Sequence, residues 1–471
     1  MKILAYFSVY SDKHKNSKKT LVSMMDATSK YNADLTYIFR YKYSILENDF
    51  LDLNKEFIYQ NKCFLKKSSL EDISDAQNFI GVSFNILRHI SSVSKQTNNL
   101  PDDDFLTKVV FAWKDIYERL KPDVFFSGLI DDYVGNIGIL VANSMGIPVL
   151  TITGGGVQQS VKVGDINYIN ISKKLSKSDI KNYYEKAYSE WNDILVRDKS
   201  VIKINSWSYD FFNLNNILKL FSLLPNSLRT YYFEIPKIER KLWLSPFCLA
   251  KRQIKYFISK NFSKFFYKKV PKNEFVLFPL NFLNDALIFT LIPKLDIISE
   301  IKKIRMALPT DVTLCVKPHP HWENADLSIR EIIEISKIKG VVMVSPHENT
   351  RELIKKSKLV IVLNSSVAYD CMFLNKPVLT IGNIFPDEIY ELKNYKELPQ
   401  ILKNSSNYVN VEINKKIIAE LYANSIIYRD ELLYTKGGID KFVSEKVVED
   451  LIIKYNLIKN KEIKMKWPKI I

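Results

Sequence analysis

The sequence predicts an α/β protein built from two units, each with a parallel sheet. The chain has 471 residues, of which 46% are hydrophobic, enough for two cores of ordinary size. Short apolar runs alternate with segments of helical periodicity in two separate parts of the chain. This alternation is typical of parallel strands joined by right-handed helical crossovers. Several of the expected strands end in polar residues, and parallel sheets bind their ligands at that end.

The first unit is expected over residues 1–172. Apolar runs predict strands over residues 2–7, 34–39, 123–127 and 147–152. Helical periodicity lies over residues 18–30, 71–97, 103–120 and 132–145. Strands that alternate with helices in this way predict one α/β unit.

Residues 173–270 have a different pattern. They are rich in aromatic residues, including Trp191, Trp207 and Trp243, and their helical periodicity is irregular. We expect a helical insertion that ends at the break Val270-Pro271-Lys272-Asn273.

A second α/β unit is expected over residues 271–425, followed over residues 426–471 by C-terminal helices with a basic tail. Its strands are predicted over residues 275–278, 312–316, 340–344, 358–363 and 377–381. Its helices are predicted near residues 285–307, 326–338, 348–356 and 365–374. The short spacing of these elements again predicts a parallel sheet.

The net charge of +16 is concentrated in two stretches. Residues 237–272 carry eleven Lys or Arg and one acid, residues 454–471 carry six and one, and the rest of the chain is nearly neutral. Such a distribution disfavours a nucleic-acid-binding protein, because no familiar reading module accompanies it.

The first basic stretch has the pattern of an amphipathic helix. Apolar side chains follow helical spacing at Ile254, Phe257, Ile258, Phe262 and Phe265. Lysines fall on the opposite side, at Lys260, Lys264 and Lys268. Two interpretations stay open: the lysines contact an anionic membrane surface, or the aromatic face packs on the protein and the lysines are solvated.

The cysteines and the N-terminus indicate the compartment. Cys63, Cys248, Cys315 and Cys371 lie far apart without a CxxC pair, so buried reduced thiols are expected rather than disulfides or a zinc site. The apolar run after Met1 is too short for a secretory signal, and no stretch of about 18 residues is free of polar interruption. These features predict a cytoplasmic protein, which would be peripheral at the inner face of the cell membrane if the basic helix binds lipid.

Two expected strands of the second unit end in residues suited to a phosphate. Residues 312–316 are followed by Lys317-Pro318-His319-Pro320-His321, and residues 358–363 by Asn364-Ser365-Ser366. Because the carboxyl ends of parallel strands meet at one edge, the two clusters should lie close together. Ser365 and Ser366 begin a predicted helix, where hydroxyl and N–H groups bind a donor phosphate or a sugar carboxylate. A simple helix cap uses the same geometry.

These motifs resemble the donor-binding half of GT-B glycosyltransferases. The resemblance rests on Phe278-Pro279-Leu280, Leu308-Pro309, Val316-Lys317-Pro318-His319-Pro320, Ser365-Ser366, Asp370 and Lys376-Pro377-Val378. The motifs are most similar to those of bacterial capsule and surface polysaccharide transferases that use CMP-activated acidic sugars, including Kdo transferases and sialyltransferases with HP and SS motifs. The layout also resembles the CDP-glycerol glycerophosphotransferases of teichoic-acid synthesis.

The resemblance implies a GT-B fold of two facing Rossmann-like domains. Residues 1–172 would bind the acceptor, and residues 271–425 would bind a nucleotide-activated donor. The family pattern implies that Asp370, one helical turn beyond Ser366, holds the ribose hydroxyls; a solvent-facing helix acid is the alternative. Asp370 replaces the commoner Glu, and the Asn-rich residues 281–284 stand where relatives often carry a more acidic turn, so the donor identity stays open.

His319 is the expected general acid. Prolines on both sides stiffen the turn that presents it, and a histidinium there would bind the donor phosphate and protonate the leaving nucleotide oxygen. Lys317 adds a second positive charge. His321 and His347 raise the hypothesis of a zinc site, but no carboxylate or cysteine completes a familiar ligand spacing, so no metal is expected.

The general base is expected in the first unit. The strand end Phe125-Phe126-Ser127-Gly128 is followed by Asp131 and Asp132 at a predicted helix start, and one of these carboxylates would accept the proton of the acceptor hydroxyl. The preference of helix starts for acids is the alternative explanation. Gly154-Gly155-Gly156 follows the next strand and would let the backbone approach a sugar, or would form a flexible loop.

The sequence therefore predicts an inverting, metal-independent glycosyltransferase without a bound cofactor. Its donor would be a CMP-sugar, with an acidic sugar such as Kdo or sialic acid as first candidate, and its acceptor a surface polysaccharide or a lipid-linked glycan. Two alternatives stay open. A CDP-glycerol-type glycerophosphotransferase would share the motifs, whereas a non-catalytic membrane-docked scaffold would use the basic stretches and bind no nucleotide.

Overall fold

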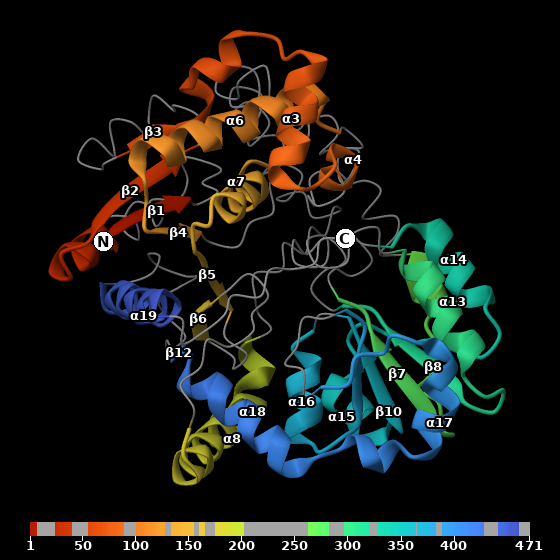
Figure 1. Ribbon diagram of the computed structural model, residues 1–471. Helices are drawn as coiled ribbons and strands as arrows, with labels where there is room; N and C mark the ends of the chain where they lie inside the picture. The colour runs from red at the N-terminus through yellow and green to blue at the C-terminus, as the bar shows by residue number, and fades with distance from the viewer. Residues whose placement is uncertain are drawn as a thin grey trace, which may run out of the picture. The chain divides into compact units, whose positions relative to one another are not determined.

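The computed structural model describes residues 1–6, 24–39, 55–88, 100–127, 133–154, 160–164, 175–201, 262–281, 296–319, 327–363, 365–382, 389–427 and 441–460. They belong to two compact units (Figure 1). The first unit contains the described residues before 173 together with those from 423 to the C-terminal helix. The second contains those between 174 and 422.

The first unit is built on a seven-stranded sheet with the order β12-β6-β5-β4-β1-β2-β3. Its strands are β1 (Lys2–Tyr6), β2 (Asp34–Phe39), β3 (Lys55–Phe57), β4 (Val124–Ser127), β5 (Val149–Gly154), β6 (Ser160–Gly164) and β12 (Ile426–Ile427). The strands from β3 to β5 are parallel, and β6 and β12 add antiparallel strands at one edge. The four strands expected in this unit are therefore confirmed.

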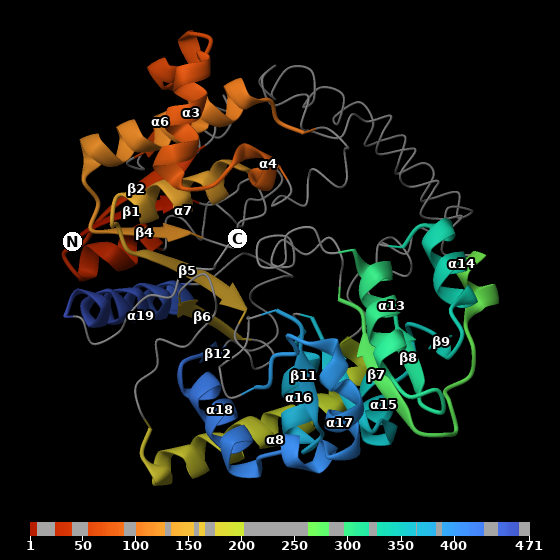
Figure 2. The ribbon, with the colours of Figure 1, turned by 45° about the vertical axis from the view of Figure 1, so that its right-hand side comes forward.

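Helices cover both faces of this sheet (Figure 2). The helices are α3 (Leu70–Ile80), α4 (Phe84–Leu87), α6 (Asp103–Leu120), α7 (Tyr133–Ser144) and α19 (Lys441–Lys459). The first four share one core with one sheet face, and α19 packs on the opposite face through Val447, Leu451 and Tyr455.

The prediction of a single helix over residues 71–97 is wrong, because α3 and α4 are separate helices. α3 ends at Ile80, because Gly81 takes a left-handed conformation with φ of 67° and its N–H returns to the carbonyl of Asn78. The chain then starts the short α4 after Ser83. A left-handed glycine of this kind ends a helix whatever the apolar pattern beyond it.

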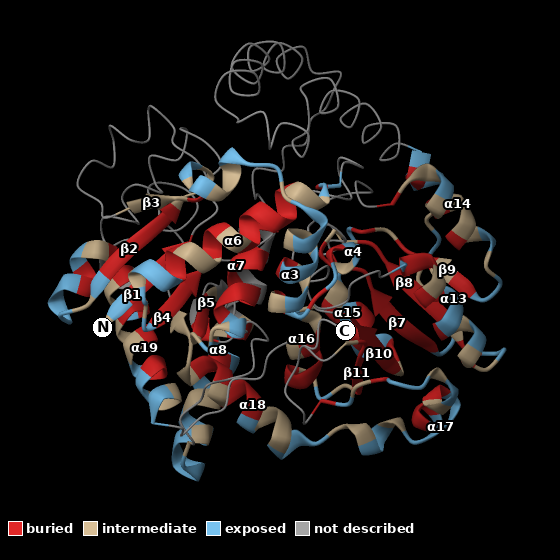
Figure 3. Cartoon of the chain, turned by 45° about the horizontal axis from the view of Figure 1, so that its top comes forward, coloured by how far each residue is buried: buried red, intermediate tan, exposed pale blue. Residues whose placement is uncertain are grey.

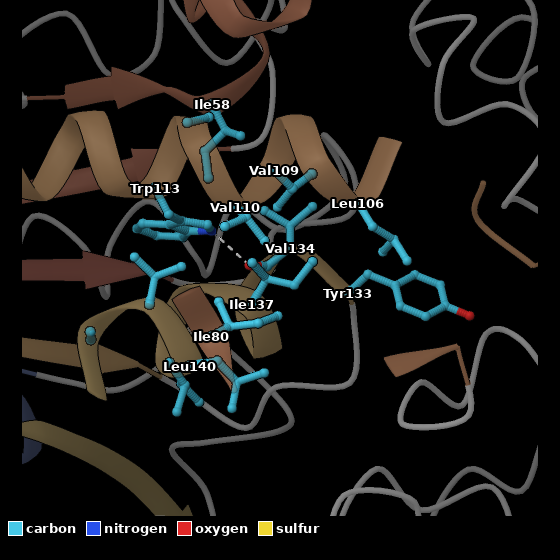
Figure 4. Close-up of a cluster of buried hydrophobic side chains, with 14 of the residues drawn as sticks. Ile58, Ile80, Leu106, Val109, Val110, Trp113, Tyr133, Val134, Ile137 and Leu140 are labelled. Atoms are coloured by element: carbon cyan, nitrogen blue, oxygen red, sulfur yellow. Dashed lines mark hydrogen bonds between the residues drawn. The ribbon is translucent and has the colours of Figure 1, made fainter. Parts of the chain in front are cut away.

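α6 and α7 are held together around one tryptophan (Figure 4). Trp113 of α6 is fully buried, and its Nε1–H donates to the carbonyl oxygen of Val134 at 2.7 Å. Its ring approaches Gly138 so closely that a Cβ there would lie 2.6 Å from Trp113 Cε2. The hydroxyl of Tyr117 donates to the carbonyl of Gly138 at 3.0 Å. α7 is thereby fixed beside the end of β4.

The second unit has a five-stranded parallel sheet with the order β11-β10-β7-β8-β9. Its strands are β7 (Phe275–Pro279), β8 (Thr313–Lys317), β9 (Val341–Met343), β10 (Leu359–Val362) and β11 (Val378–Thr380). They lie within two residues of the expected bounds. Most of their residues are buried (Figure 3).

Helices also flank this second sheet on both faces. They are α8 (Lys177–Val201), α13 (Ile297–Ala307), α14 (Ile329–Lys337), α15 (Thr350–Lys356), α16 (Val367–Phe373), α17 (Leu398–Lys403) and α18 (Val411–Ala423). Helices α13, α14 and α17 share a core with one face of the sheet. The residues of α15 and α16 lie outside that core, and these two helices contact β7, β10 and β11. Short 3-10 helices are η1 (Ile58–Gln60), η2 (Lys62–Leu65), η4 (Lys264–Phe266), η6 (Tyr395–Glu397) and η7 (Ser405–Tyr408).

The α/β class with two Rossmann-like units is thus confirmed. Of the expected insertion over residues 173–270, the structure describes α8 and residues 262–270, and both cluster with the second unit. Helix α19 clusters with the first unit. The proposed boundaries at residues 172, 270 and 425 stay predictions.

The described cysteines are free thiols, as expected. Cys315 and Cys371 are buried, and burial raises the pKa of both thiols. Cys63 is half-buried, and Cys248 lies outside the described residues. Among the described helices, none combines the length and the apolar character that crossing a bilayer requires.

Candidate active site

The topology of the second unit identifies where a ligand should bind. From β7 the chain builds β8 and β9 on one side and then β10 and β11 on the other. Open parallel sheets bind ligands at such a switch point, outside the carboxyl ends of the strands. The two predicted phosphate clusters follow β8 and β10, the neighbours of β7 on either side. The expectation that they share one edge is confirmed.

Lys317 is the last residue of β8 and stands opposite Pro279 in the register with β7. Leu314 and Val316 belong to the core shared with α13 and α14, so the alternation of the strand directs Lys317 to the face of α15 and α16. Only 3% of Lys317 is exposed, and its ammonium makes no hydrogen bond or ion pair with the residues that the structure describes. Desolvation lowers its pKa to about 8, although Glu348 acts in the opposite direction.

A buried lysine without a partner is costly for the protein. Lys317 lies at the switch point, where an anionic ligand would place a negative charge beside its ammonium and offset the free-energy cost of burying it. Glu348, which precedes α15, is exposed and acts on Lys317 only through a Coulomb interaction. No local pattern in the sequence marks Glu348, because its relation to Lys317 depends on the adjacency of β8 and β9.

His319 follows two residues after β8 and is partly buried. It is the last described residue before the gap that includes His321, so the structure does not bear on a pairing of these two imidazoles. His347 is exposed on the loop before α15. Within the described ranges, no group of three or more His, Cys, Asp or Glu is arranged to hold a metal ion. The roles predicted for His319 and Lys317 stay predictions.

Ser365 and Ser366 differ in what their hydroxyls do. The Oγ of Ser365 accepts a hydrogen bond from the N–H of Val367 at 3.3 Å, so it supports the start of α16. Ser366 is exposed and its side chain makes no capping bond. The cap interpretation therefore holds for Ser365, and Ser366 is the better candidate for contact with a ligand.

Asp370 is not the solvent-facing acid that we considered as an alternative. Its Oδ1 accepts hydrogen bonds from Trp191 Nε1 at 2.7 Å and from Arg351 Nε at 3.2 Å. The guanidinium carbon of Arg351 lies 4.1 Å from the centre of the Trp191 ring, which also stacks on Phe373 at 4.9 Å. These contacts join α8, α15 and α16 in one cluster.

This cluster is a feature that the sequence analysis missed. Trp191 and Arg351 are each at least nine-tenths buried, although one was assigned to an insertion and the other to a helix without a function. The signal that was available is an unusual run of aromatic residues in α8, at Tyr183, Tyr184, Tyr188 and Trp191. In this structure Asp370 holds α8 through its contacts with Trp191 and Arg351.

The remaining predicted residues are only partly described. Asp131, Asp132 and Lys260 lie outside the described residues, as do Gly155 and Gly156. The prediction that an amphipathic helix continues through Lys268 is wrong. Helical structure stops at Ser263, and Lys264 begins a 3-10 turn.

The chain leaves the helix there because its next residues bind the second unit. Phe266 and Tyr267 pack against the core, and the N–H of Lys268 donates to the carbonyl of Met343 in β9 at 2.9 Å. Phe265 points away and is 84% exposed, and Lys264 and Lys268 are exposed as well. The ring of Phe265 contacts that of Phe262 edge-on at 6.2 Å, and the two interpretations of this stretch both stay open.

Comparisons with known proteins bear on the second unit above all. Residues 231–388 match a family described as capsule polysaccharide biosynthesis protein. This span covers less than half of the chain and contains Lys317, His319, Ser365, Ser366 and Asp370. A comparison with curated proteins finds no match.

Several solved structures overlap weakly with most of the chain. The UDP-GlcNAc 2-epimerase of Methanocaldococcus jannaschii is 15% identical, with 89% of this chain and 98% of that one covered and a TM-score of 0.27. The epimerase of Neisseria meningitidis is 12% identical, with coverage of 96% and 100% and a TM-score of 0.28. The β-Kdo 2,7 transferase KpsC of Thermosulfurimonas dismutans is 12% identical, with coverage of 73% and 89% and a TM-score of 0.32.

Overlaps as weak as these carry no argument about the chemistry of this chain. The family match is independent of them and falls on the motifs from which the resemblance was first drawn. Over residues 231–388 this chain is thus similar to the capsule polysaccharide biosynthesis proteins, as its motifs indicated.

Proposed function

We propose that this protein is a glycosyltransferase of capsule or surface polysaccharide synthesis, which transfers a sugar from a nucleotide donor to a glycan or lipid-linked acceptor. The observation that carries the proposal is Lys317, a buried cation at the switch point of the second sheet that no other described residue pairs with. The negative charge of a nucleotide phosphate would compensate the positive charge of the Lys317 ammonium. The family match over the same residues supports a role in capsule polysaccharide synthesis.

The residues at this edge suggest a mechanism. Lys317 and the exposed Ser366 would bind the donor phosphate, and His319 would protonate the leaving oxygen as the glycosidic bond to the nucleotide breaks. A carboxylate of the first unit, Asp131 or Asp132, would take the proton of the attacking acceptor hydroxyl. We infer an inverting reaction that needs no metal, since protein cations would stabilise the developing phosphate charge; a strict requirement for Mg²⁺ or Mn²⁺ after EDTA treatment would contradict this.

The donor we propose is a CMP-activated acidic sugar such as Kdo or sialic acid. A thermal-shift screen with CMP, CDP, UMP, UDP, GDP and dTDP tests the nucleotide, because a ligand that binds only the folded state raises the melting temperature. We expect CMP to stabilise the wild type, and Lys317→Met, Ser366→Ala and His319→Ala to reduce the shift. Lys302→Met is the control, because Lys302 is exposed and paired with Glu334.

The outcomes of this screen separate the candidate functions. A shift by UDP or GDP alone would preserve a transferase and reject the CMP donor. A shift by CDP together with turnover of CDP-glycerol would favour the glycerophosphotransferase. If no nucleotide shifts the wild type, the transferase proposal fails and a non-catalytic scaffold takes its place.

The cellular location that we propose is the cytoplasmic face of the membrane, where the turn at Phe265 would contact lipid. Phe265 is 84% exposed, and Lys264, Lys268, Lys269 and Lys272 surround it in the sequence without an intervening acid. An exposed aromatic ring among lysines suits an anionic bilayer. Equal flotation of the wild type and Phe265→Ser with phosphatidylglycerol vesicles would contradict this contact.

A further inference from the structure

We propose that Ser127 and Asn136 form a subsite for a neutral, hydroxyl-bearing ligand at the carboxyl edge of the first sheet. The identity of that ligand as the acceptor glycan rests on the proposed function. The subsite itself rests on topology and on two buried polar atoms that lack hydrogen-bond partners in the part of the chain that the structure describes.

The first sheet has its own switch point. From β1 the chain builds β2 and β3 on one side and then β4 and β5 on the other, so the switch point lies between the carboxyl ends of β1 and β4. Ser127 is the last residue of β4 and pairs in register with Tyr6, the last residue of β1. Asn136 lies in the first turn of α7, which begins at Tyr133 after the short connection from β4. Both residues therefore stand at this edge.

Each of these residues buries a polar atom that the described protein leaves unsatisfied. Ser127 is 0% exposed, and no described residue forms a hydrogen bond with its Oγ. Asn136 is 6% exposed, and its Nδ2 likewise has no partner among the described residues. Phe125 belongs to the core shared with α6 and α7, so strand alternation places Ser127 on the sheet face that α7 covers.

Unsatisfied buried groups are rare because each costs free energy. Among the described residues of the first unit, Thr107 and Ser444 are also unsatisfied, but they lie within α6 and α19 and away from strand ends. In this unit, Ser127 and Asn136 are thus the pair that a ligand could satisfy from the edge where such sheets bind ligands.

The chemistry of the two atoms indicates the ligand class. An amide NH₂ donates, and a serine hydroxyl both donates and accepts, so both groups suit the oxygens of alcohols. No cation comparable to Lys317 stands at the end of β4 or β1 among the described residues. A neutral hydroxyl is therefore favoured over a phosphate, and a glycan presents many such hydroxyls.

The test uses the full-length protein and does not need a donor. Binding of methyl glycosides of galactose, glucose, N-acetylglucosamine and Kdo is measured by saturation-transfer difference NMR and titration. We expect at least one of them to bind the wild type, and Ser127→Ala and Asn136→Leu to bind it about tenfold more weakly or not at all. Ser444→Ala is the matched control, because it removes an equally buried, unsatisfied hydroxyl from the opposite side of the sheet and should leave binding unchanged.

The ligand-free melting temperature gives a second readout. Removal of an unsatisfied hydroxyl should not lower it, so Ser127→Ala and Ser444→Ala are both expected to melt at or above the wild-type temperature. Weaker glycoside binding without a loss of stability would support the subsite. Unchanged glycoside binding by Ser127→Ala would overturn the subsite. A lowered melting temperature of this variant would overturn it too, because it would mean that the hydroxyl is already satisfied by an enclosed water.

The nucleotide screen separates this inference from the proposed function. If CMP shifts the wild type but no glycoside binds it, only the subsite is rejected. If glycosides bind through Ser127 and no nucleotide shifts the protein, the transferase proposal fails and the subsite remains as a sugar-binding site.

Discussion

At the scale of single residues, two buried cations of the second unit, Lys317 and Arg351, have different surroundings. Lys317 is buried and makes no hydrogen bond or ion pair with another described residue, whereas Arg351 is buried and paired with the partly buried Asp370. Breaking a buried ion pair leaves an uncompensated charge, whereas a buried charge without a protein partner is already a cost to the fold. The two residues therefore call for different tests.

The depressed pKa of Lys317 predicts how binding depends on pH. Desolvation lowers this pKa from 10.5 to about 8, so the folded protein releases the proton while the unfolded chain still holds it. Between about pH 8 and pH 10.5 the contribution of Lys317 to stability therefore rises with pH, and below about pH 8 the buried charge is a cost. The affinity of Lys317 for an anion should instead fall with rising pH, because the neutral amine carries no positive charge.

We expect nucleotide affinity to fall as the pH rises through about 8, because the ammonium is then lost. Calorimetric titration with CMP from pH 6.5 to 9.5 measures it. Lys317→Met should bind at least about tenfold more weakly at pH 7 and show no such decline. The same pH profile in Lys317→Met and the wild type would place the titrating group elsewhere.

The pair at Asp370 predicts a loss of stability. Asp370→Asn removes the negative charge that Arg351 faces in a buried site, and we expect the free energy of unfolding to fall by about 1 to 3 kcal/mol. Urea unfolding measures this change. Glu352→Gln is the control, because Glu352 forms an exposed pair with Lys355 whose loss should cost less than about 1 kcal/mol.

The same variant separates the two roles of Asp370. If Asp370→Asn keeps wild-type stability but loses CMP binding, the ribose contact implied by the family resemblance is its main role. If stability falls and CMP affinity is retained, Asp370 serves mainly to hold α8.

At the scale of elements, α7 carries Asn136 and follows the strand that ends at Ser127. Its position depends on the close approach of Gly138 to Trp113, which brings α6 and α7 together (Figure 4). A glycine in a helix normally reduces stability by about 1 kcal/mol, so its presence here is explained by the lack of space for a Cβ.

Gly138→Ala should therefore destabilise the first unit although alanine is the better helix former. The added Cβ would lie 2.6 Å from Trp113 Cε2, and overpacking of this kind costs about 1 to 3 kcal/mol. Thermal unfolding followed by tryptophan fluorescence measures it. Gly164→Ala is the control, since a Cβ at Gly164 meets open space; equal melting temperatures for the two variants would contradict the steric explanation.

At the scale of the whole molecule, each unit has its own core and its own switch point. Helix α19, from the end of the chain, completes the first unit. It buries Leu451 against the sheet, and Lys454 donates hydrogen bonds to the carbonyl of Val163 and to Asp450. The stability of the first unit therefore depends on residues nearly 300 positions beyond β6.

This organisation predicts that the two units respond separately to mutation. Leu451→Ala should destabilise the first unit by about 2 to 5 kcal/mol, because Leu451 is 1% exposed. Ile453→Ala, on an exposed part of the same helix, should change little. In denaturant unfolding we expect two transitions, one for each unit. CMP should move only the transition of the second unit to higher denaturant concentration, and Leu451→Ala should move only that of the first unit to lower concentration. A single transition that both perturbations move together would contradict this.

The sequence predicted the strands well and the helix ends less well. Strand positions follow from short apolar runs, and those at residues 34–39 and 275–278 were placed within one residue of β2 and β7. The break at Gly81 and the turn after Ser263 were missed, because a left-handed glycine and a contact with β9 decide them rather than periodicity.

By itself, the sequence determined the α/β class, the order of strands and helices, and the polar clusters that follow β8 and β10. These are local properties, set by apolar spacing and by the residues at strand ends. Only the tertiary structure decided that Lys317 is buried without a partner among the described residues, that Asp370 is held by Trp191 and Arg351, and that Ser127 and Asn136 share one edge. Burial and pairing depend on segments far apart in the chain, and no local pattern records which of them meet.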